Sequence, residues 1–186
     1  MKTAHSDVDF LYKNIEQITA TIENAKKGIW ENNFDQQPPY GLSSIIFLAE
    51  THHCISLYDP HGIIQKLKQE VATYPPALKQ SVIQQSLWAT EFTLWYAEQS
   101  AAKHDMYNIM GCLTRAIKHI VTTLFAMNEI YPMGDKRALD ILEKASIKPL
   151  ELQQQIDAIL SADKSTVEKN ITLARSLWSH TVSIVK

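Results

Sequence analysis

Two carboxylates stand one residue apart near the start of the sequence, in Asp7-Val8-Asp9. Side chains alternate between the two faces of a strand, so in a strand both acids would project to the same side. Such a pair can hold Mg²⁺, which prefers oxygen ligands and keeps waters and substrate phosphates in its shell. The alternative is an acidic end that faces water, as most acidic side chains do. Taken alone, the tripeptide favours this alternative.

A second group of candidates combines an arginine, a histidine and a glutamate. Arg115 and His119 are four residues apart, so on a helix they share a face and can together meet an anion. The spacing is one residue shorter than the Arg-x-x-x-x-His of the helical ribonucleases of toxin–antitoxin systems. Glu91 lies among large apolar residues, in Leu-Trp-Ala-Thr-Glu-Phe. It either pairs with Arg115 or faces a cleft where a raised pKa suits a general base.

Other chemistry-bearing residues give weaker patterns. Asn128 and Tyr131 share a helix face near a helix end, where they either contact a ligand or cap the following turn. Adjacent His52 and His53 would point about 100° apart on a helix, which is poor for joint zinc ligation. Cys112 lies on the apolar side of a helix with no activating terminus beside it. We therefore expect neither a zinc site nor a thiol nucleophile.

Helical periodicity dominates the elements that must position these residues. Pro76 opens a long helix to about residue 103, and Asp105 is the expected N-cap of a second, reaching residue 131. Two long helices with a short connection lie antiparallel, and later helices can complete a bundle. Further helices are expected over 15–28, 42–57, 64–71 and 136–145, then from Pro149 and from Ser165, with a strand over 8–12 and a loop over 30–40. The fold class is mainly α, an up-and-down helical bundle with a short N-terminal strand.

The apolar residues of the first long helix give its expected core face. Leu78, Val82, Trp88, Phe92 and Trp95 fall close to helical spacing, and we expect them to be buried together. The second long helix shows a similar stripe. It consists of Ile109, Cys112, Ala116, Ile120, Leu124 and Met127.

Composition limits the class of protein. The 186 residues are 45% hydrophobic and 20% charged, with a net charge of −2, and suit one domain or one with a small appendage. This charge argues against a nucleic-acid binder, and no apolar run approaches the ~20 residues that span a bilayer. The opening MKTAHSDVDF lacks the apolar core of a signal peptide. With two cysteines in apolar surroundings, the expected location is the cytoplasm.

Six short motifs occur in order along the chain. They are Leu57-Tyr58-Asp59-Pro60-His61-Gly62, Tyr74-Pro75, Leu87-Trp88-x-x-Glu91-Phe92, Lys103-His104-Asp105, Gly111-Cys112-Leu113-Thr114-Arg115-Ala116 and Leu124-Phe125-Ala126-Met127-Asn128-x-x-Tyr131. Together they resemble a largely uncharacterised bacterial family of nucleotidyltransferase-like proteins. That family is similar in layout to the aminoglycoside and lincosamide nucleotidyltransferases, which join an N-terminal α/β catalytic domain to a helical bundle that helps bind the acceptor.

The resemblance implies that the chain is divided into two parts and that it lacks the phosphate-binding half of the catalytic domain. The family's catalytic domain begins with a Gly-Ser turn and an Asp-x-Asp strand, but only six residues precede Asp7 and none is glycine. Residues 8–12 instead resemble the later catalytic strand, with Asp9 as the surviving acid and metal ligand. We therefore expect 1–40 to be a remnant of the catalytic domain and 41–186 to be the helical bundle domain. The chain alone is expected to be inactive, with Mg²⁺ and nucleoside triphosphate relevant only if a catalytic half is supplied.

The resemblance also implies roles for five polar residues that would face the acceptor cleft. Glu91 would position or deprotonate an acceptor hydroxyl. Arg115 and Lys136 would contact phosphate or another anion, and Asn128 and Tyr131 would contact a small-molecule acceptor. These roles rest on analogy with the family.

Partners follow from the same resemblance. A missing sheet leaves an apolar face and an unpaired strand edge, which favour a homo-oligomer or a nucleotidyltransferase partner, with no nucleic acid and no membrane. One alternative is an interaction or antitoxin-like subunit that docks on a separate chain. Another is a helical ribonuclease, which would require Arg115 and His119 to converge at a dimer cleft.

Overall fold

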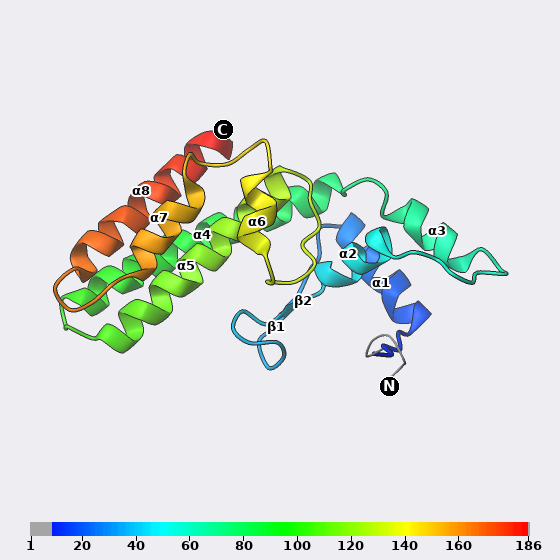
Figure 1. Ribbon diagram of the computed structural model, residues 1–186, viewed down its shortest axis with the longest axis horizontal. Coiled ribbons are helices and arrows are strands. Elements are labelled where there is room, and N and C mark those ends of the chain that lie inside the picture. Colours follow the sequence, from blue (N-terminus) through cyan, green and yellow to red (C-terminus); the bar gives the residue numbers. More distant parts are fainter. Residues whose placement is uncertain (1–8, 186) are drawn as a thin grey trace, which may run out of the picture.

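The computed structural model describes residues 9–185, and their regular secondary structure is almost entirely helical (Figure 1). The expected mainly α fold is confirmed. The elements in order are α1 (Ile15–Lys26), β1 (Asn32–Asn33), β2 (Leu42–Ser43), α2 (Ile45–His53), α3 (Ile63–Glu70), α4 (Pro76–Ala101), α5 (Met106–Met127), α6 (Ala138–Glu143), α7 (Leu152–Leu160) and α8 (Val167–Val185).

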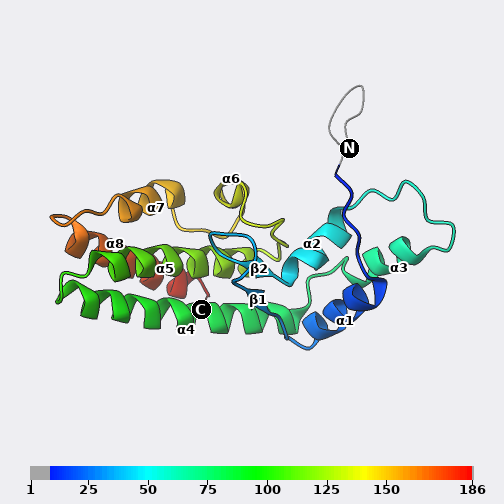
Figure 2. The same ribbon diagram turned by 90° about the horizontal axis from the view of Figure 1, so that it is seen from below.

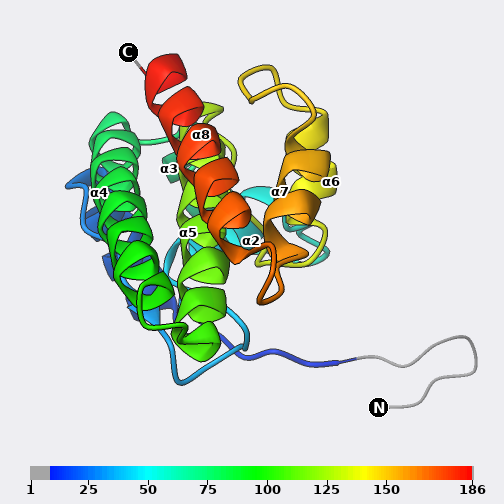
Figure 3. The ribbon, with the colours of Figure 1, turned by 90° about the vertical axis from the view of Figure 1, so that its left-hand side faces the viewer.

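Helices α4, α5, α7 and α8 form a bundle around the larger core, as the end-on view shows (Figure 3). The pairs α4–α5 and α7–α8 are antiparallel, whereas α5 and α8 also pack together and run in the same direction (Figure 1). Helix α6 lies in the connection between α5 and α7 (Figure 1). Asp105 caps α5 as expected, accepting a hydrogen bond from the Asn108 N–H at 3.2 Å. A 2.6 Å ion pair between Glu98 and Arg175 joins α4 to α8.

A second core forms where α1, α2 and α3 meet the start of α4 and the end of α5 (Figure 2). It includes Ile22 of α1, Leu48 of α2 and Leu78 of α4, all buried. Because α1 belongs to the same core as α2 and α4, the boundary expected at residue 40 does not separate two cores.

The buried face of α4 differs from the expected one. Leu78 and Val82 are buried as expected, but the side chains of Trp88, Phe92 and Trp95 are 66%, 52% and 49% exposed. The helix buries a face of smaller residues, Ser86, Thr90, Thr93, Leu94, Ala97 and Ser100. Small side chains let α4 and α5 approach closely along their length, and the bulky aromatic residues are left outside. The expected stripe of α5 is buried apart from Cys112, which is partly exposed.

The N-terminal strand expected over residues 8–12 is not present over the part that the structure describes. Residues 9–14 have no regular secondary structure, and Phe10, Leu11 and Tyr12 are all largely exposed. A strand needs a neighbour to pair its backbone groups, and no described segment lies beside this one as a strand. Asp7 and Val8 lie outside the described residues.

The remaining helix boundaries shift by a few residues. The helix expected from residue 42 begins at Ile45, because Leu42 and Ser43 pair with Asn33 and Asn32 in a two-stranded hairpin. The loop expected over 30–40 therefore contains one short strand. The helix expected from Pro149 begins at Leu152.

Within residues 9–185, α5 is the one helix long and apolar enough to cross a membrane by length and composition. It packs against α4, α7 and α8, and 56% of its most apolar window is buried within the protein. A core helix passes the same test, and the packing of α5 is that of a core helix.

Candidate ligand-binding cavity

A short antiparallel hairpin forms one wall of the best-defined cavity. Asn32 pairs with Ser43 and Asn33 with Leu42, and the Asn32 amide donates a 3.0 Å hydrogen bond to the Tyr40 carbonyl. Gly41 has a φ of +81°, and a Cβ at this position would lie 2.7 Å from the Asn33 carbonyl oxygen. A glycine is therefore required for the hairpin to close at this point.

The cavity has a volume of about 340 Å³ and is partly enclosed. The hairpin and α2 form one side, a face of α5 forms the floor, and the 132–140 segment and α7 complete the wall. Most of the lining is apolar, and the α5 floor is provided by Ile117, Val121 and Phe125. Volumes from about 300 to 1,000 Å³ are typical of small-molecule sites, so the cavity falls near the lower end of that range.

Lys118 brings a positive charge to this apolar floor. Its ammonium lies 6.0 Å from the centroid of the Trp30 ring, within reach of a cation–π interaction. Within residues 9–185 it has no acidic partner within 4 Å. Burial lowers the pKa of Lys118, and nearby Asp135 opposes this effect. An ammonium that lacks an anion in such a place is well suited to pair with an anionic or polar group of a ligand.

Asp135 and Tyr40 provide further polar groups at the cavity. Desolvation raises the pKa of the Asp135 carboxyl, and Lys118 partly offsets this. Desolvation and the charge of Asp135 raise the pKa of the Tyr40 phenol, which therefore stays protonated at neutral pH. A carboxyl with a raised pKa is better matched to proton transfer near neutral pH than a fully solvated one.

Two buried polar atoms at the hairpin side have no hydrogen-bond partner among the described residues. They are the Nε1 of Trp30 and the Oδ1 of Asn32, and both residues line the cavity. Leaving a buried donor or acceptor unpaired costs about 1–3 kcal/mol. A ligand or a water molecule with a complementary group would satisfy either atom.

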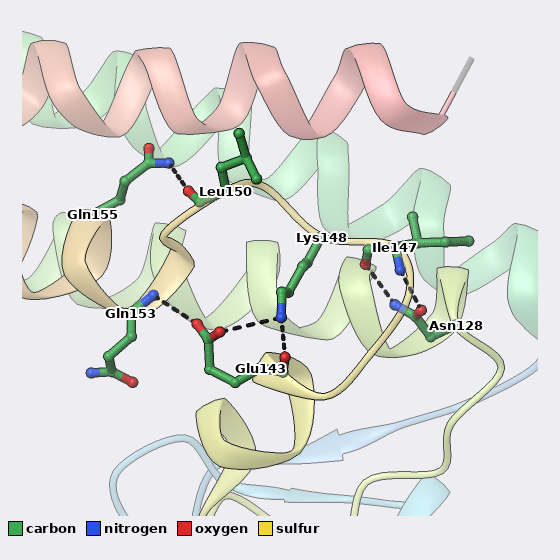
Figure 4. A network of polar contacts seen from close by, with 7 residues as sticks. All are labelled: Asn128, Glu143, Ile147, Lys148, Leu150, Gln153 and Gln155. Atoms are coloured by element: carbon green, nitrogen blue, oxygen red, sulfur yellow. Dashed lines mark hydrogen bonds and ion pairs between the residues drawn. The ribbon is translucent and has the colours of Figure 1, made fainter.

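Asn128 and Tyr131 are held in structural contacts. The Asn128 amide donates to the Ile147 carbonyl at 2.7 Å, and its Oδ1 accepts from the Ile147 N–H at 2.9 Å (Figure 4). The same amide also donates to the Leu124 carbonyl at 2.8 Å. Tyr131 is buried, stacks on Tyr74 and donates to the Thr73 carbonyl at 3.2 Å. Burial raises the pKa of Tyr131 to about 12. The capping alternative describes Asn128 well, and neither side chain lines the cavity.

The other expected site residues are spread over the surface. Glu91 is exposed on α4, Arg115 is exposed on α5, and no ion pair joins them. Lys136 is exposed in a shallow hollow beside α6. Asp9 is exposed in the N-terminal segment, and no group of three or more potential metal-ligating side chains occurs among residues 9–185. The structure therefore does not bring the expected catalytic and substrate-binding residues together.

His119 is buried on α5, and its environment disfavours the charged imidazolium. Burial, followed by the charges of Lys118 and Arg115, lowers the pKa of His119 to about 3. A ribonuclease that uses a histidine for proton transfer needs a pKa much nearer to neutral. The ribonuclease alternative is therefore not supported by this histidine.

Sequence reasoning missed Trp30, Asn32, Tyr40, Lys118 and Asp135. Three of them lie in the 30–40 segment, which the sequence predicts to be a loop, and Asp135 lies in the connection between the end of α5 at Met127 and the start of α6 at Ala138. The available signal was Lys118 itself, which is with Arg115 one of two basic side chains on this mainly apolar helix and directly precedes His119. Nothing in the spacing of the other four indicates that they meet.

Comparison with known proteins adds one match. Residues 46–136 match the model of a family described as a domain of unknown function, DUF4037. The match covers just under half of the chain, from α2 to the segment after α5, so it includes Lys118 and Asp135 but not the hairpin. No curated protein and no solved structure matches the chain.

Proposed function

We propose that this chain is the acceptor-binding helical part of a nucleotidyltransferase-like protein and that it holds a small-molecule acceptor in the hairpin cavity. The observation that carries the proposal is the convergence of Lys118, Asp135 and the unpaired Asn32 Oδ1 on one partly enclosed apolar cavity. An apolar cavity with a few convergent polar groups is the usual form of a ligand site. The order of sequence motifs supports the family assignment.

The lining selects among acceptors. Because the cavity is mainly apolar, it favours an acceptor with an apolar body and a few polar groups, as in a lincosamide, over a polycationic aminoglycoside. Lys118 would repel an ammonium group placed next to it, whereas Asn32 can accept a hydrogen bond from a hydroxyl. Among the two acceptor classes of the resembled enzymes, lincomycin is therefore the better probe.

Asp135 replaces Glu91 as the proposed base in this account. Asp135 is solvent-exposed, as Glu91 is, but it lines the cavity and Glu91 does not. Its raised pKa and its position at the cavity suit it to accept a proton from an acceptor hydroxyl. Mg²⁺ and the nucleoside triphosphate would be supplied with a separate catalytic half. With acceptor alone, the expected property of this chain is binding.

A titration of lincomycin by calorimetry, with kanamycin as comparator, tests the proposal. Thr122 lines the cavity and Thr172 is exposed on α8, and each hydroxyl bonds the carbonyl four residues earlier at 2.9 Å. The variant Thr122→Trp fills the cavity and should abolish lincomycin binding, whereas Thr172→Trp should bind as the unmodified protein does. Equal binding by both variants would place the ligand elsewhere. Failure of the unmodified protein to bind lincomycin would contradict the proposed acceptor class.

The alternative, a protein that docks on another chain, is favoured by the exposed aromatic residues of α4. The ring centroids of Trp88 and Phe92 lie 5.5 Å apart and those of Phe92 and Trp95 lie 5.9 Å apart, all on the surface. With a net charge of −2, repulsion between copies is weak, so a second copy of the chain is the candidate occupant. Light scattering over a wide concentration range should then show a dimer, and Trp88→Ala should weaken its association. A monomer at every concentration would exclude self-association.

A further inference from the structure

A second hollow, distinct from the hairpin cavity, runs between the C-terminal half of α4 and the N-terminal half of α5, whose side-by-side course Figure 2 shows. Its volume is about 1,040 Å³, and the tip of the hairpin closes one side with Phe34 and Pro39. We propose that this α4–α5 groove binds a small aromatic anion, a flat ring that carries a phosphate or a carboxylate. The proposal does not rest on the proposed function, because the groove and the cavity share only Tyr40 and Lys118 in their linings.

The charges of the groove are of one sign. Arg115 and Lys118 line it, and no aspartate or glutamate does. Within residues 9–185, Arg115 has no acidic partner within 4 Å. The guanidinium presents a planar fork of donors that matches a carboxylate or a phosphate. An anionic group is therefore the complement of this wall.

The rest of the lining is rich in rings, and these give the groove its second selective feature. Tyr96 and Phe92 extend from α4 and Tyr107 from α5, and all three side chains are exposed. Exposed aromatic faces stack with flat ligands, which removes apolar surface from water. The five aromatic residues of the lining are Phe34, Tyr40, Phe92, Tyr96 and Tyr107.

His119 supplies an independent indication of a ligand. His119 lines both the groove and a smaller hollow beside Trp30 and Trp88, and it is only 8% exposed. Its Nδ1 is buried without a hydrogen-bond partner among the described residues. A buried ring nitrogen left unpaired is costly, and a ligand or a ligand-bound water in the groove can complete its hydrogen bonding. The neutral ring can offer a donor or an acceptor, depending on its tautomer.

A small anion fits this groove better than a nucleic acid does. Affinity for a nucleic acid grows with the number of phosphates that basic residues neutralise, and only two basic side chains line the groove. The overall charge of −2 provides no further attraction. The combination of two cations with several rings matches a single ring with one anionic substituent.

The test is a calorimetric titration of the protein with 1-naphthyl phosphate. Separate titrations with 1-naphthoate, with the uncharged 2-naphthol and with inorganic phosphate provide the comparison. We expect both naphthyl anions to bind, and the one with the higher affinity shows whether the groove prefers a phosphate or a carboxylate. We expect 2-naphthol and inorganic phosphate each to bind at least about tenfold more weakly. Arg115→Gln should weaken naphthyl anion binding by about tenfold or more. Arg137→Gln, at an exposed arginine that lines the hairpin cavity instead, is the matched control and should leave it unchanged.

Several results would overturn the proposal. Equal affinity for 2-naphthol would show apolar binding without anion recognition, and an unchanged affinity in Arg115→Gln would remove the assigned partner. Loss of binding in Thr122→Trp with retention in Arg115→Gln would place the probe in the hairpin cavity. Much tighter binding of a single-stranded oligonucleotide, with a steep dependence on salt, would make the groove a nucleic-acid site. Because Arg115 is exposed, its replacement should leave the thermal unfolding curve unchanged, which confirms that the variant is folded.

Discussion

The ammonium of Lys118 on α5 lies 6.0 Å from the ring centroid of Trp30, which is separated from the start of the hairpin at Asn32 by the single residue Glu31. This contact joins two segments almost ninety residues apart in the sequence. Lys118 lines both the cavity and the groove, whereas Trp30 lines the cavity but not the groove. It places a charged group where the surroundings are mainly apolar. Stability and ligand binding should therefore respond in opposite directions to changes at Lys118.

Replacing Lys118 with methionine keeps an unbranched apolar stem and removes the charge. Since burial lowers the pKa of Lys118, the ammonium is held at a cost, and Lys118→Met should raise the free energy of unfolding at pH 7 by about 1 kcal/mol. The same variant should bind lincomycin about tenfold more weakly or worse. Urea unfolding and calorimetry on the same preparations measure the two effects. A loss of stability in Lys118→Met would show that the ammonium is part of a favourable network.

His119 should make the fold sensitive to mild acid. Its pKa falls from 6.5 to about 3 on folding, so below pH 6.5 the unfolded chain binds a proton that the folded chain does not. The free energy of unfolding should therefore decrease as pH falls through this range, by roughly 2 kcal/mol between pH 7 and pH 5. The charges of Lys118 and Arg115 add to the effect of burial.

The control for this dependence is His119→Gln, which cannot take up the proton. In the variant, the decrease in unfolding free energy from pH 7 to pH 5 should be smaller by roughly 2 kcal/mol, which is the contribution assigned to His119. Equal pH dependence in the two proteins would mean that His119 titrates normally in the folded state.

Adjacent residues on α4 should differ greatly in their contribution to stability. Leu94 is fully buried, and Leu94→Ala should cost about 2–5 kcal/mol because it leaves a cavity in the bundle core. Trp95 is about half exposed, so Trp95→Ala should cost less than Leu94→Ala does, despite the larger side chain that is removed. Denaturant titrations of the two variants give both values. A larger loss of stability in Trp95→Ala than in Leu94→Ala would indicate that the aromatic face of α4 is the buried one.

The incorrectly predicted buried face of α4 shows which structural features hydrophobic periodicity can predict and which it cannot. Spacing located the helix and its Pro76 start, because local preference and capping act within a few residues. It placed Trp88 in the core because hydrophobic spacing alone does not say which face meets a neighbour. The observed core face depends on Ala97 and Thr90 being small enough for α5 to approach. That requirement is set by packing between helices and is not contained in one helix pattern.

The candidate cavity was beyond sequence reasoning for a related reason. Asp105 was recognisable because an N-cap acts on residues directly after it. Asn32, Lys118 and Asp135 instead come from a hairpin, a helix and a connecting segment that meet only after folding. Asn128 was placed near a helix end correctly, and the Ile147 backbone that occupies its amide lies nineteen residues away.

Two glycines provide a matched test of the hairpin. Gly41 and Gly62 both have positive φ values, +81° and +66°, but a Cβ would meet the Asn33 backbone only at Gly41 and would find open space at Gly62. Gly62→Ala should cost about 1 kcal/mol from backbone strain alone. Gly41→Ala should cost more and should also weaken lincomycin binding, because the hairpin wall of the cavity shifts. Equal effects of the two variants on binding would show that the hairpin is not part of the site.

Methyl NMR during addition of lincomycin tests the central claim most directly. If lincomycin binds in the hairpin cavity, chemical-shift changes are expected at the methyl groups of Ile46, Ile117 and Val121, which line it. Leu94 and Leu113, in the core between α4 and α5, should show no change. Shifts confined to the cavity methyls would establish an acceptor-binding site there. Absence of any shift at saturating lincomycin, or shifts that leave Ile46, Ile117 and Val121 unaffected, would contradict the account.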